Sequence, residues 1–463
     1  MDLKVRPFWE NFTHTINRSR LNCLLHDEED RFHSEHQLSY KLFERARESM
    51  QGGVPMLWMI RWAGAFPVFV KEAKGAHFTD LDGHSYIDFC LGDTGAMTGH
   101  SPQATVDAIK AQAVKGITFM LPTEDAIWVG EELQRRFGLK YWQFTLTATD
   151  ANRFAIRMAR HITERPKILV FNYCYHGSVD EAFISLDEEG TPGPRHGNLG
   201  PPINPVETTK VIEFNDIPAL ETALSARDVA VVLAEPVMTN IGIIHPDPGY
   251  HDALREITRR TDTMLIIDET HTLCAGPGGY TQKHGLRPDF LTCGKSLAGG
   301  IPVGVYGFSQ EVAETFWTKL EIDQSDVGGI GGTLAGNALS VAAMRATLEN
   351  VLTPTMYARS GKLADRYEAG INTVIKEFDL PWIVKRLGFR VEYWFSRTPP
   401  HNGGEANSAI DPELDRYMHL WALNRGILLT PFHNMALIAA DTTEADVDYH
   451  TEVFRGAVKS LIG

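Results

Sequence analysis

The sequence predicts an α/β protein, with a large domain built on a mostly parallel sheet flanked by helices and a smaller α+β domain. Apolar runs at residues 168–171, 229–233 and 264–267 lack period-two alternation, which is typical of strands covered by helices on both faces. Helical patterns alternate with such runs between about residues 100 and 345. After about residue 350 the pattern changes, which indicates the second domain.

The N-terminal part is expected to join the smaller domain. Residues 1 to about 50 are polar and charged with scattered apolar positions, which indicates peripheral helices. The aromatic stretch Leu57–Trp62 is either a packing segment or the wall of a pocket. Residues 69–89 are predicted to form a pair of short strands, joined by a turn at 80–83 that carries the Asp-Gly hairpin signal.

The later elements show clear periodicities. Phe154, Met158 and Ile162 recur at the spacing of one buried helix face. Residues 388–395 alternate, which predicts a half-buried strand of an antiparallel sheet, and a final amphipathic helix is expected at about 444–461. The predicted domains are 1–75, a helical segment that joins the small domain, then 76–345, the large domain, and 346–463, the small C-terminal domain.

The charge balance excludes several classes of protein. With 44 Lys+Arg against 59 Asp+Glu, the formal net charge is −15, which argues against a general nucleic-acid binder or a protein of anionic membrane surfaces. No apolar run reaches the roughly 18 residues that a membrane span needs, and residues 1–14 lack the apolar core of a secretory signal. The 5 dispersed cysteines favour a reducing, cytoplasmic location, and no metal site is expected.

Polar clusters follow four of the predicted strands. They are Tyr175-His176-Gly177, Glu235-Pro236, the segment 268–271 and the segment 294–296. In parallel α/β sheets, ligands bind beyond the C-terminal ends of the strands, which lie at the same edge. The clusters together therefore predict a cleft that holds an aromatic ring, two acids and a lysine.

Lys295 and Asp268 are the most informative residues of this cleft. Most lysines are solvated, but a desolvated lysine with a depressed pKa can form a Schiff base with a carbonyl compound. Asp268 ends a buried strand, where an ionised carboxylate needs a cationic partner. A protonated pyridine nitrogen is one such partner, and a helix cap or a structural ion pair is the alternative.

This arrangement resembles the class III (ω-type) aminotransferases, which are fold-type I pyridoxal-phosphate enzymes that include the glutamate-1-semialdehyde aminomutase branch. The resemblance runs from about Phe69 to the C-terminus. It implies a seven-stranded, mostly parallel sheet and pyridoxal 5′-phosphate as the cofactor. The matching motifs are Asp82-Gly83, Gly99-His100, Tyr175-His176-Gly177, Asp268-Glu269, Pro288-Asp289-Phe290, Gly294-Lys295, the segment 299–304 and the segment 332–337.

The resemblance also implies roles for the residues of the cleft. Lys295 would form the internal aldimine and move the substrate proton, while Asp268 would pair with the pyridinium nitrogen. Tyr175, followed by His176, would stack on one face of the ring. Thr270 stands where the family usually has valine on the other face. Glu235 would order groups near the cofactor, with a purely structural acid as the alternative.

The phosphate site is expected at Thr147-Ala148-Thr149, where a helix begins. Ala148 replaces a glycine of the family pattern, so the local backbone is expected to differ. Thr149 is the candidate direct ligand, and an ordinary helix cap is the alternative. Thr333 resembles a ligand that the neighbouring subunit donates, which implies a homodimer with shared active sites, or a tetramer.

Substrate contacts are expected from two arginines and two aromatic residues. Arg61 and Arg390 are candidates for binding a carboxylate, although a surface ion pair with Glu392 is the simpler interpretation of Arg390. Trp58 and Phe432 indicate an apolar entrance. The favoured donors are therefore hydrophobic amines or β- or ω-amino compounds.

The predicted activity is that of a transaminase that moves an amino group to a small keto acid such as pyruvate. An aminomutase of the glutamate-1-semialdehyde type, which returns the amino group to the same carbon skeleton, is the first alternative. A cofactor-binding protein without turnover is the second, and the presence of both Lys295 and Asp268 disfavours it.

Overall fold

The computed structural model describes residues 16–319 and 328–463, which form two compact units. The first unit contains the described residues up to Ser101 together with Ala358–Pro399 and Ser408–Gly463. The second contains those of Pro102–Tyr357 together with Pro400–Asn407. The sequence predicts boundaries after residues 75 and 345, whereas the units divide after Ser101 and Tyr357. The prediction about residues 1–14 concerns a segment outside the described residues.

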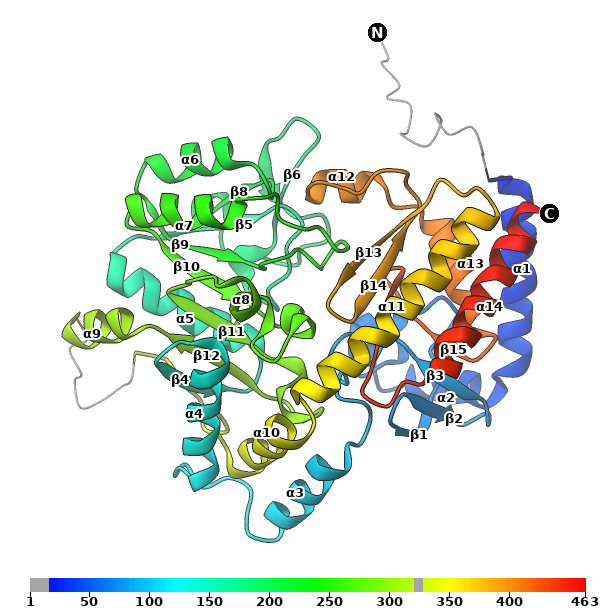
Figure 1. Cartoon of the computed structure of the whole chain (residues 1–463), viewed down its shortest axis with the longest axis horizontal. Helices are drawn as coiled ribbons and strands as arrows, with labels where there is room; N and C mark the ends of the chain where they lie inside the picture. Colours follow the sequence, from blue (N-terminus) through cyan, green and yellow to red (C-terminus); the bar gives the residue numbers. More distant parts are fainter. Residues whose placement is uncertain (1–15, 320–327) are drawn as a thin grey trace. The chain divides into compact units, whose positions relative to one another are not determined.

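A seven-stranded sheet forms the centre of the second unit, in the order β4-β12-β11-β10-β9-β5-β8 (Figure 1). All its neighbouring strands run parallel except β12, which is antiparallel to both β11 and β4. The predicted fold class is thereby confirmed, and the three predicted apolar runs lie in β5, β9 and β10. The strands are β4 (Tyr141–Thr145), β5 (Lys167–Phe171), β8 (Thr209–Ile212), β9 (Val229–Ala234), β10 (Met264–Asp268), β11 (Phe290–Cys293) and β12 (Gly304–Phe308).

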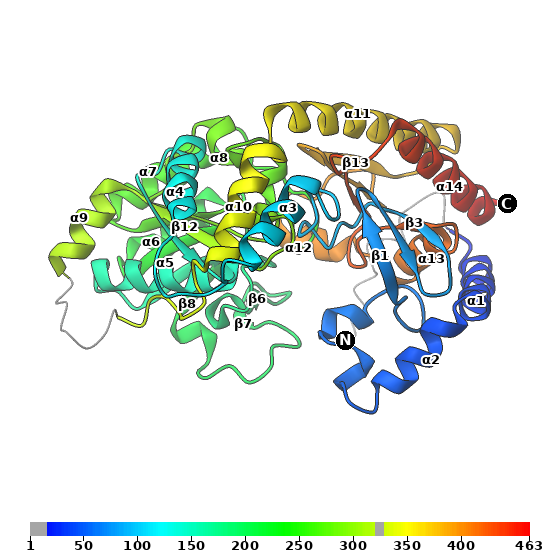
Figure 2. The ribbon, with the colours of Figure 1, turned by 90° about the horizontal axis from the view of Figure 1, so that it is seen from below.

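Helices cover this sheet, so its central strands are buried on both faces. Every residue of β9 is buried, as its unbroken apolar run predicts. Helix α5 packs against β4 and β9–β12, with Met158 and Ile162 buried and Phe154 packed against the same core. Figure 2 shows α3 and α4 beside α10, and α10 is in contact with each of them. The helices are α3 (Gln103–Ala113), α4 (Glu124–Phe137), α5 (Ala148–Thr163), α6 (Ile217–Ser225), α7 (Tyr250–Arg260), α8 (Gly279–His284), α9 (Gln310–Lys319) and α10 (Ala338–Asn350).

The second unit also holds a small hairpin and one distant helix. β6 (Ile184–Leu186) pairs antiparallel with β7 (Pro192–Pro194). α12 (Gly403–Ser408) begins in the segment Pro400–Asn407, which belongs to this unit although it lies far along the chain. Gly403 is required there, because a Cβ at this position would lie 2.2 Å from the carbonyl oxygen of Asn172.

The first unit contains a four-stranded sheet in the order β1-β2-β3-β15. The predicted pair of strands at 69–89 is wrong in number, because three strands form: β1 (Val70–Lys74), β2 (His77–Asp80) and β3 (Ser85–Asp88). The turn at 80–83 does join β2 to β3, and Gly83 there has a φ of +95°. β3 pairs in parallel with β15 (Ile427–Leu428), which ties this region to the C-terminal part of the chain.

A second, three-stranded sheet runs in the order β13-β14-β16, from β13 (Ile383–Leu387), β14 (Arg390–Trp394) and β16 (Met435–Leu437). The strand predicted at 388–395 is antiparallel, as expected, but the expected half burial is wrong because every residue of β14 is buried. Tyr393 packs on Phe454 from one side, with 5.1 Å between ring centroids, and Arg390 contacts Thr94 from another segment.

Long helices complete the first unit. The final helix is predicted well, since it runs over Glu444–Ile462. Within the described part of the chain, no helix is long and apolar enough to span a membrane. The helices are α1 (Arg18–Glu35), α2 (Gln37–Ala46), α13 (Pro412–Leu423) and α14 (Glu444–Ile462), and α11 (Pro354–Glu377) begins in the second unit and continues into the first.

Candidate active site

Lys295 lies directly after β11, at the C-terminal edge of the large sheet. It is the first residue of a short 3-10 turn, Lys295–Ala298, and its φ of +55° places it in the left-handed region. Non-glycine residues adopt this conformation rarely, and such positions cluster at functional sites. The Nζ atom of Lys295 lies 2.7 Å from Nε2 of His271, which follows the neighbouring strand β10. The fold therefore holds the lysine in one defined place.

Asp268 is the last residue of β10, and its side chain is buried. Its Oδ2 accepts hydrogen bonds from Nδ2 of Asn152 and from Nδ1 of His176, each over 2.9 Å. Its Oδ1 accepts from the backbone N–H of Thr270 over 3.1 Å. Asn152 itself is oriented by Thr292, whose hydroxyl donates to Oδ1 of Asn152 over 2.6 Å. Three chain segments thus converge on one carboxylate.

The electrostatics keep Asp268 ionised despite its burial. Burial raises the pKa of Asp268, but the hydrogen bond and the charge of His176 outweigh it and hold the pKa well below its ordinary value. Burial lowers the pKa of His176, but Cys174 and Asp268 beside the ring raise it more strongly. The site therefore contains a buried carboxylate beside an imidazolium, with Oδ1 of Asp268 bonded to only one donor among the described residues.

Helix α5 begins beside this carboxylate. Thr147 is its N-cap, and its hydroxyl accepts from the backbone N–H of Asp150 over 3.2 Å. Ala148 is the first residue of the helix, and its φ is not positive; that its backbone differs from that of the family glycine stays a prediction. The hydroxyl of Thr149 accepts from the backbone N–H of Ser178 over 3.0 Å, which ties the helix to the loop after β5.

Three glycines allow neighbouring segments to pack closely against the start of α5. A Cβ on Gly177, which has a φ of +72°, would lie 2.0 Å from Oγ1 of Thr149. A Cβ on Gly294 would lie 2.9 Å from Cβ of Ala148, and one on Gly304 would lie 2.4 Å from the carbonyl oxygen of Thr147. Backbone therefore approaches backbone where α5 presents its free N–H groups, which suits an anion such as a phosphate.

These features fit a phosphorylated pyridine. The helix start offers backbone donors for a dianion, and the ionised Asp268 with an acceptor position on Oδ1 suits a pyridinium N–H. Asn152 lies in the first turns of α5 and also bonds Asp268, so the two features belong to one site. Lys295 supplies the amine next to them along the sheet edge, since β10 and β11 are neighbours.

The other residues predicted for the cofactor lie in or near these segments. Tyr175 is half-buried and packs edge-on against Phe183, with 6.3 Å between ring centroids. Glu235 accepts from the backbone and side chain of Thr239 in its own turn, which is a structural bond. Thr270 is buried beside Asp268, and Thr333 is exposed in the glycine-rich segment before α10. The roles that the sequence predicts for these residues stay predictions.

The residues predicted to bind substrate lie in the first unit. Trp58, Arg61 and Phe432 come together: the Trp58 ring packs edge-on against Phe432 at 5.0 Å, and the guanidinium of Arg61 lies 5.7 Å from the Trp58 ring centroid. Trp58 is 43% exposed and Phe432 is 40% exposed. They form an exposed aromatic group, and their role toward a substrate stays a prediction.

Arg390 is not in a surface ion pair, so that interpretation is wrong. Its side chain is 1% exposed, because neighbouring segments cover both sides of β14. Its Nη1 lies 2.7 Å from Sδ of Met435, and its Nη2 donates to the hydroxyl of Thr94. No carboxylate of the described residues pairs with it, and its Nε has no hydrogen-bond partner there.

Sequence reasoning missed two residues of the site. Asn152 donates a hydrogen bond to Asp268. The sequence feature that could have indicated it is a polar amide on the buried face of α5, the helix that begins at the predicted phosphate site. His271 contacts Lys295, and its signal was its place three residues after Asp268, beyond the end of the strand.

Comparison with known proteins decides the family. Residues 59–444 match the family model described as aminotransferase class-III. The chain belongs to the class-III aminotransferases. Its cofactor is pyridoxal phosphate or the amino form of that compound, PMP. The family match thus confirms the predicted family and the predicted cofactor of this class-III enzyme.

Several relatives are aminomutases. A glutamate-1-semialdehyde-aminomutase from Pseudomonas aeruginosa has a crystal structure that covers 97% of this chain and 100% of its own, with 48% identity and a TM-score of 0.95. A lysine-to-alanine variant of such a protein has been solved in complex with PMP. A glutamate-1-semialdehyde 2,1-aminomutase 2 of Halalkalibacterium halodurans is 33% identical over 90% of this chain and 97% of its own length.

An ω-transaminase is a weaker match. The enzyme from Sphaerobacter thermophilus is 29% identical, with a TM-score of 0.84, over 92% of this chain and 98% of its own. The predicted transfer of an amino group to a keto acid such as pyruvate is therefore wrong as the main assignment. The aminomutase relatives overturn it and support the alternative that the sequence left open.

Proposed function

We propose that this class-III enzyme is an aminomutase, which moves an amino group between adjacent carbons of one carbon skeleton. The substrate class is an amino-aldehyde of the glutamate-1-semialdehyde type. The similarity that carries this proposal is the 48% identity, over 97% of the chain, to the Pseudomonas aeruginosa aminomutase. In such a reaction the amino group leaves carbon 2 and carbon 1 receives it, while the carbonyl function passes from carbon 1 to carbon 2, with one water released at carbon 1 and one taken up at carbon 2, so no second substrate is consumed.

The bound cofactor supplies an electron sink and a temporary carrier for the amino group. We assign Lys295 Nζ to covalent attachment and to proton transfer at the substrate carbon, because it is the lysine at the sheet edge next to Asp268. His271 Nε2, 2.7 Å from Nζ, orients the amine. Asp268 holds a proton on the pyridine nitrogen, and His176 and Asn152 keep Asp268 ionised and in position.

The assembly that we propose is a homodimer. Thr333 is exposed in the described chain, within the glycine-rich segment before α10. We assign Thr333 of the partner subunit to the phosphate site formed by α5. A Thr333→Val variant should release the cofactor more readily, as equilibrium dialysis against buffer would measure. Unchanged retention of the cofactor by this variant would contradict the assignment.

The deciding experiment supplies one substrate and no acceptor. The cofactor-loaded enzyme is incubated with glutamate 1-semialdehyde, and 5-amino-4-oxopentanoate is measured by mass spectrometry. We expect product from the wild type and none from Lys295→Ala. Product formation only after an amine and pyruvate are supplied together, with alanine as the product, would overturn the proposal.

A further inference from the structure

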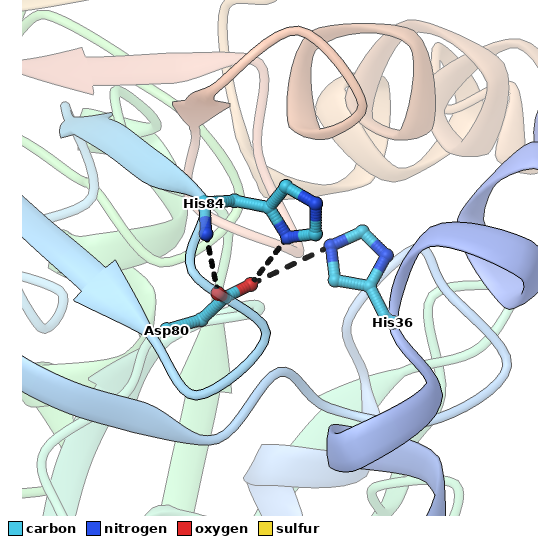
Figure 3. Close-up of side chains that lie close together, drawn as sticks. All are labelled: His36, Asp80 and His84. Carbon is cyan, nitrogen blue, oxygen red and sulfur yellow. Dashed lines mark hydrogen bonds and ion pairs between the residues drawn. The ribbon is translucent and has the colours of Figure 1, made fainter.

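Three metal-binding atoms lie close together in the side chains of His36, Asp80 and His84 (Figure 3). These residues belong to the first unit, whereas Lys295 belongs to the second. His36 lies between α1 and α2, Asp80 ends β2, and His84 immediately precedes β3. Their ligand atoms all lie within 4.8 Å of one another. Figure 3 shows a nitrogen of each ring pointing toward the Asp80 carboxylate.

The spacing of these atoms suits a small divalent cation. Oδ2 of Asp80 lies 3.6 Å from Nε2 of His36 and 3.0 Å from Nδ1 of His84. Zinc binds histidine nitrogen and carboxylate oxygen at about 2.0–2.2 Å in tetrahedral geometry, so its ligand atoms lie about 3.3–3.5 Å apart. The two observed separations fall on either side of that value. Small rotations of the side chains would therefore be enough to seat the ion.

Outer contacts already orient two of the three ligands. Nδ1 of His36 lies 2.7 Å from the carbonyl oxygen of Phe32, which can only accept, so the proton is on Nδ1 and the lone pair of Nε2 faces Asp80. Oδ1 of Asp80 accepts from the backbone N–H of His84 over 2.8 Å. Histidine ligands of metals almost always donate their other N–H to a carbonyl or carboxylate in this way.

Tyr86 closes the cluster on another side. Its hydroxyl lies 2.7 Å from Nε2 of His36 and 2.9 Å from Oδ2 of Asp80. The single hydroxyl proton can satisfy only one of these two acceptors at a time, and Nδ1 of His84, 3.0 Å from Oδ2 of Asp80, is the other possible donor to the carboxylate. A cation between the acceptors would satisfy both, and the phenol oxygen of Tyr86 is then placed as a fourth ligand or as an outer partner.

We propose that His36, Asp80 and His84 bind one divalent cation of the zinc class. Two imidazole nitrogens and one carboxylate are ligands that zinc accepts readily. The ion would join the α1–α2 junction to the β2–β3 hairpin and would stabilise the fold rather than act in catalysis. The side chain of His84 is 37% exposed and provides the entry path, whereas Asp80 is fully buried. Coordination through Nδ1 places the His84 proton on Nε2.

The test uses the cofactor-loaded full-length enzyme after chelator treatment. Zn²⁺ is titrated in competition with a chromophoric chelator, and Co²⁺ is added separately to record the visible absorbance of a tetrahedral site. We expect one ion per chain and a higher apparent Tm with Zn²⁺, because the ion binds only the folded state. Absence of stoichiometric binding at micromolar Zn²⁺ would overturn the proposal.

Two variants separate this site from binding elsewhere. His84→Ala should weaken Zn²⁺ binding by more than the roughly 10- to 100-fold that loss of an outer partner costs, and should abolish the Zn²⁺ effect on Tm. His77→Ala is the matched control, because His77 lies on the same hairpin and bonds Asp446 over 2.9 Å. Equal losses in both variants would contradict the assignment. If His84→Ala does not fold, His84→Gln provides the same comparison.

Discussion

Asp268 and His176 face each other with 2.9 Å between Oδ2 and Nδ1, and both side chains are buried. Burying an ionised carboxylate without a cationic partner costs too much free energy. Asp268 is therefore ionised only because the imidazolium of His176 lies beside it. The acid in turn is what the pyridine nitrogen requires. We therefore propose that His176 acts on the cofactor through Asp268, as a positioning residue.

His176→Gln tests this relationship. Glutamine retains hydrogen bonding but loses the charge, so the pKa of Asp268 should rise and the cofactor should bind more weakly. A hydrogen bond between charged groups contributes about 1.5–3 kcal/mol, which corresponds to a loss of affinity of about 10- to 150-fold. Fluorescence titration of the apoenzyme with cofactor measures it. Asn152→Asp, which places a second acid beside Oδ2, should weaken binding as well, and wild-type affinity in both variants would refute this role.

Lys295→Ala tests the covalent assignment. After borohydride reduction, the wild type should gain the mass of one cofactor per chain, because the reduced link to a lysine is permanent. The Ala variant should show no such gain by intact mass spectrometry. Lys283→Ala, at the end of α8, serves as the control and should retain it. A mass gain in Lys295→Ala would place the link on another residue.

The buried carboxyl group of Asp415 should make the free energy of unfolding depend on pH. Burial raises its pKa to about 7, although Nδ2 of Asn434 donates to it over 2.6 Å. The pKa of this carboxyl group is lower in the unfolded state than in the folded state. Between the two pKa values, the folded state thus keeps a proton that the unfolded state has lost. Stability from this group falls as the pH rises from about 4 to about 7, by at most about 4 kcal/mol.

Asp415→Asn should remove this decline, because the amide resembles the protonated acid at every pH. The difference in apparent Tm between pH 5 and pH 8 should therefore be smaller in the variant than in the wild type. Glu413→Gln removes an exposed charge from the same helix and should leave the difference unchanged. Equal pH slopes in Asp415→Asn and the wild type would show that the acid is ionised in the folded state at pH 5.

Arg390→Met is expected to preserve or raise stability. A buried guanidinium without a carboxylate partner among the described residues costs free energy, whereas methionine fills a similar space without charge. The apparent Tm should be unchanged or higher by roughly 1–4 °C. A clear fall in Tm would show that the cation is needed for folding.

The same Arg390 variant also tests a carboxylate-binding role. If Arg390 binds a substrate carboxylate, as the sequence predicts, the KM for the amino-aldehyde acid should rise although the fold is intact. Arg366→Met, which removes an arginine from an exposed ion pair, is the control and should leave the KM unchanged.

Much of the large sheet could be predicted because its signals are local. The apolar runs of β5, β9 and β10 are continuous in sequence, so their burial and the polar residues after them were recognisable. The sequence therefore placed Lys295 and Asp268 at one sheet edge. β1 was missed because Val70–Lys74 is mostly exposed and carries charged residues, which a strand with an exposed face tolerates.

The rest depends on pairs that are far apart in sequence. Arg390 is buried partly by Thr94, which lies 296 residues earlier in the chain. The alternation of residues 388–395 therefore cannot indicate this burial. His36 reaches Asp80 across 44 positions, because α1 and α2 return the chain to the hairpin. Asn152 orients Asp268 from 116 positions away. These contacts exist only once the units have formed.

The division of the chain has a consequence for biosynthesis. The described residues up to Ser101 pack with segments that start at Ala358, and Glu28 bonds Arg425 over 2.8 Å. The intervening 357 − 101 = 256 residues take roughly 13–50 s to synthesise. During that interval the nascent N-terminal part has no strand β15 to pair with, so we expect ribosome-bound chains to be protease-sensitive there until their last hundred residues emerge. Proteolysis of stalled nascent chains of increasing length would measure when that protection appears.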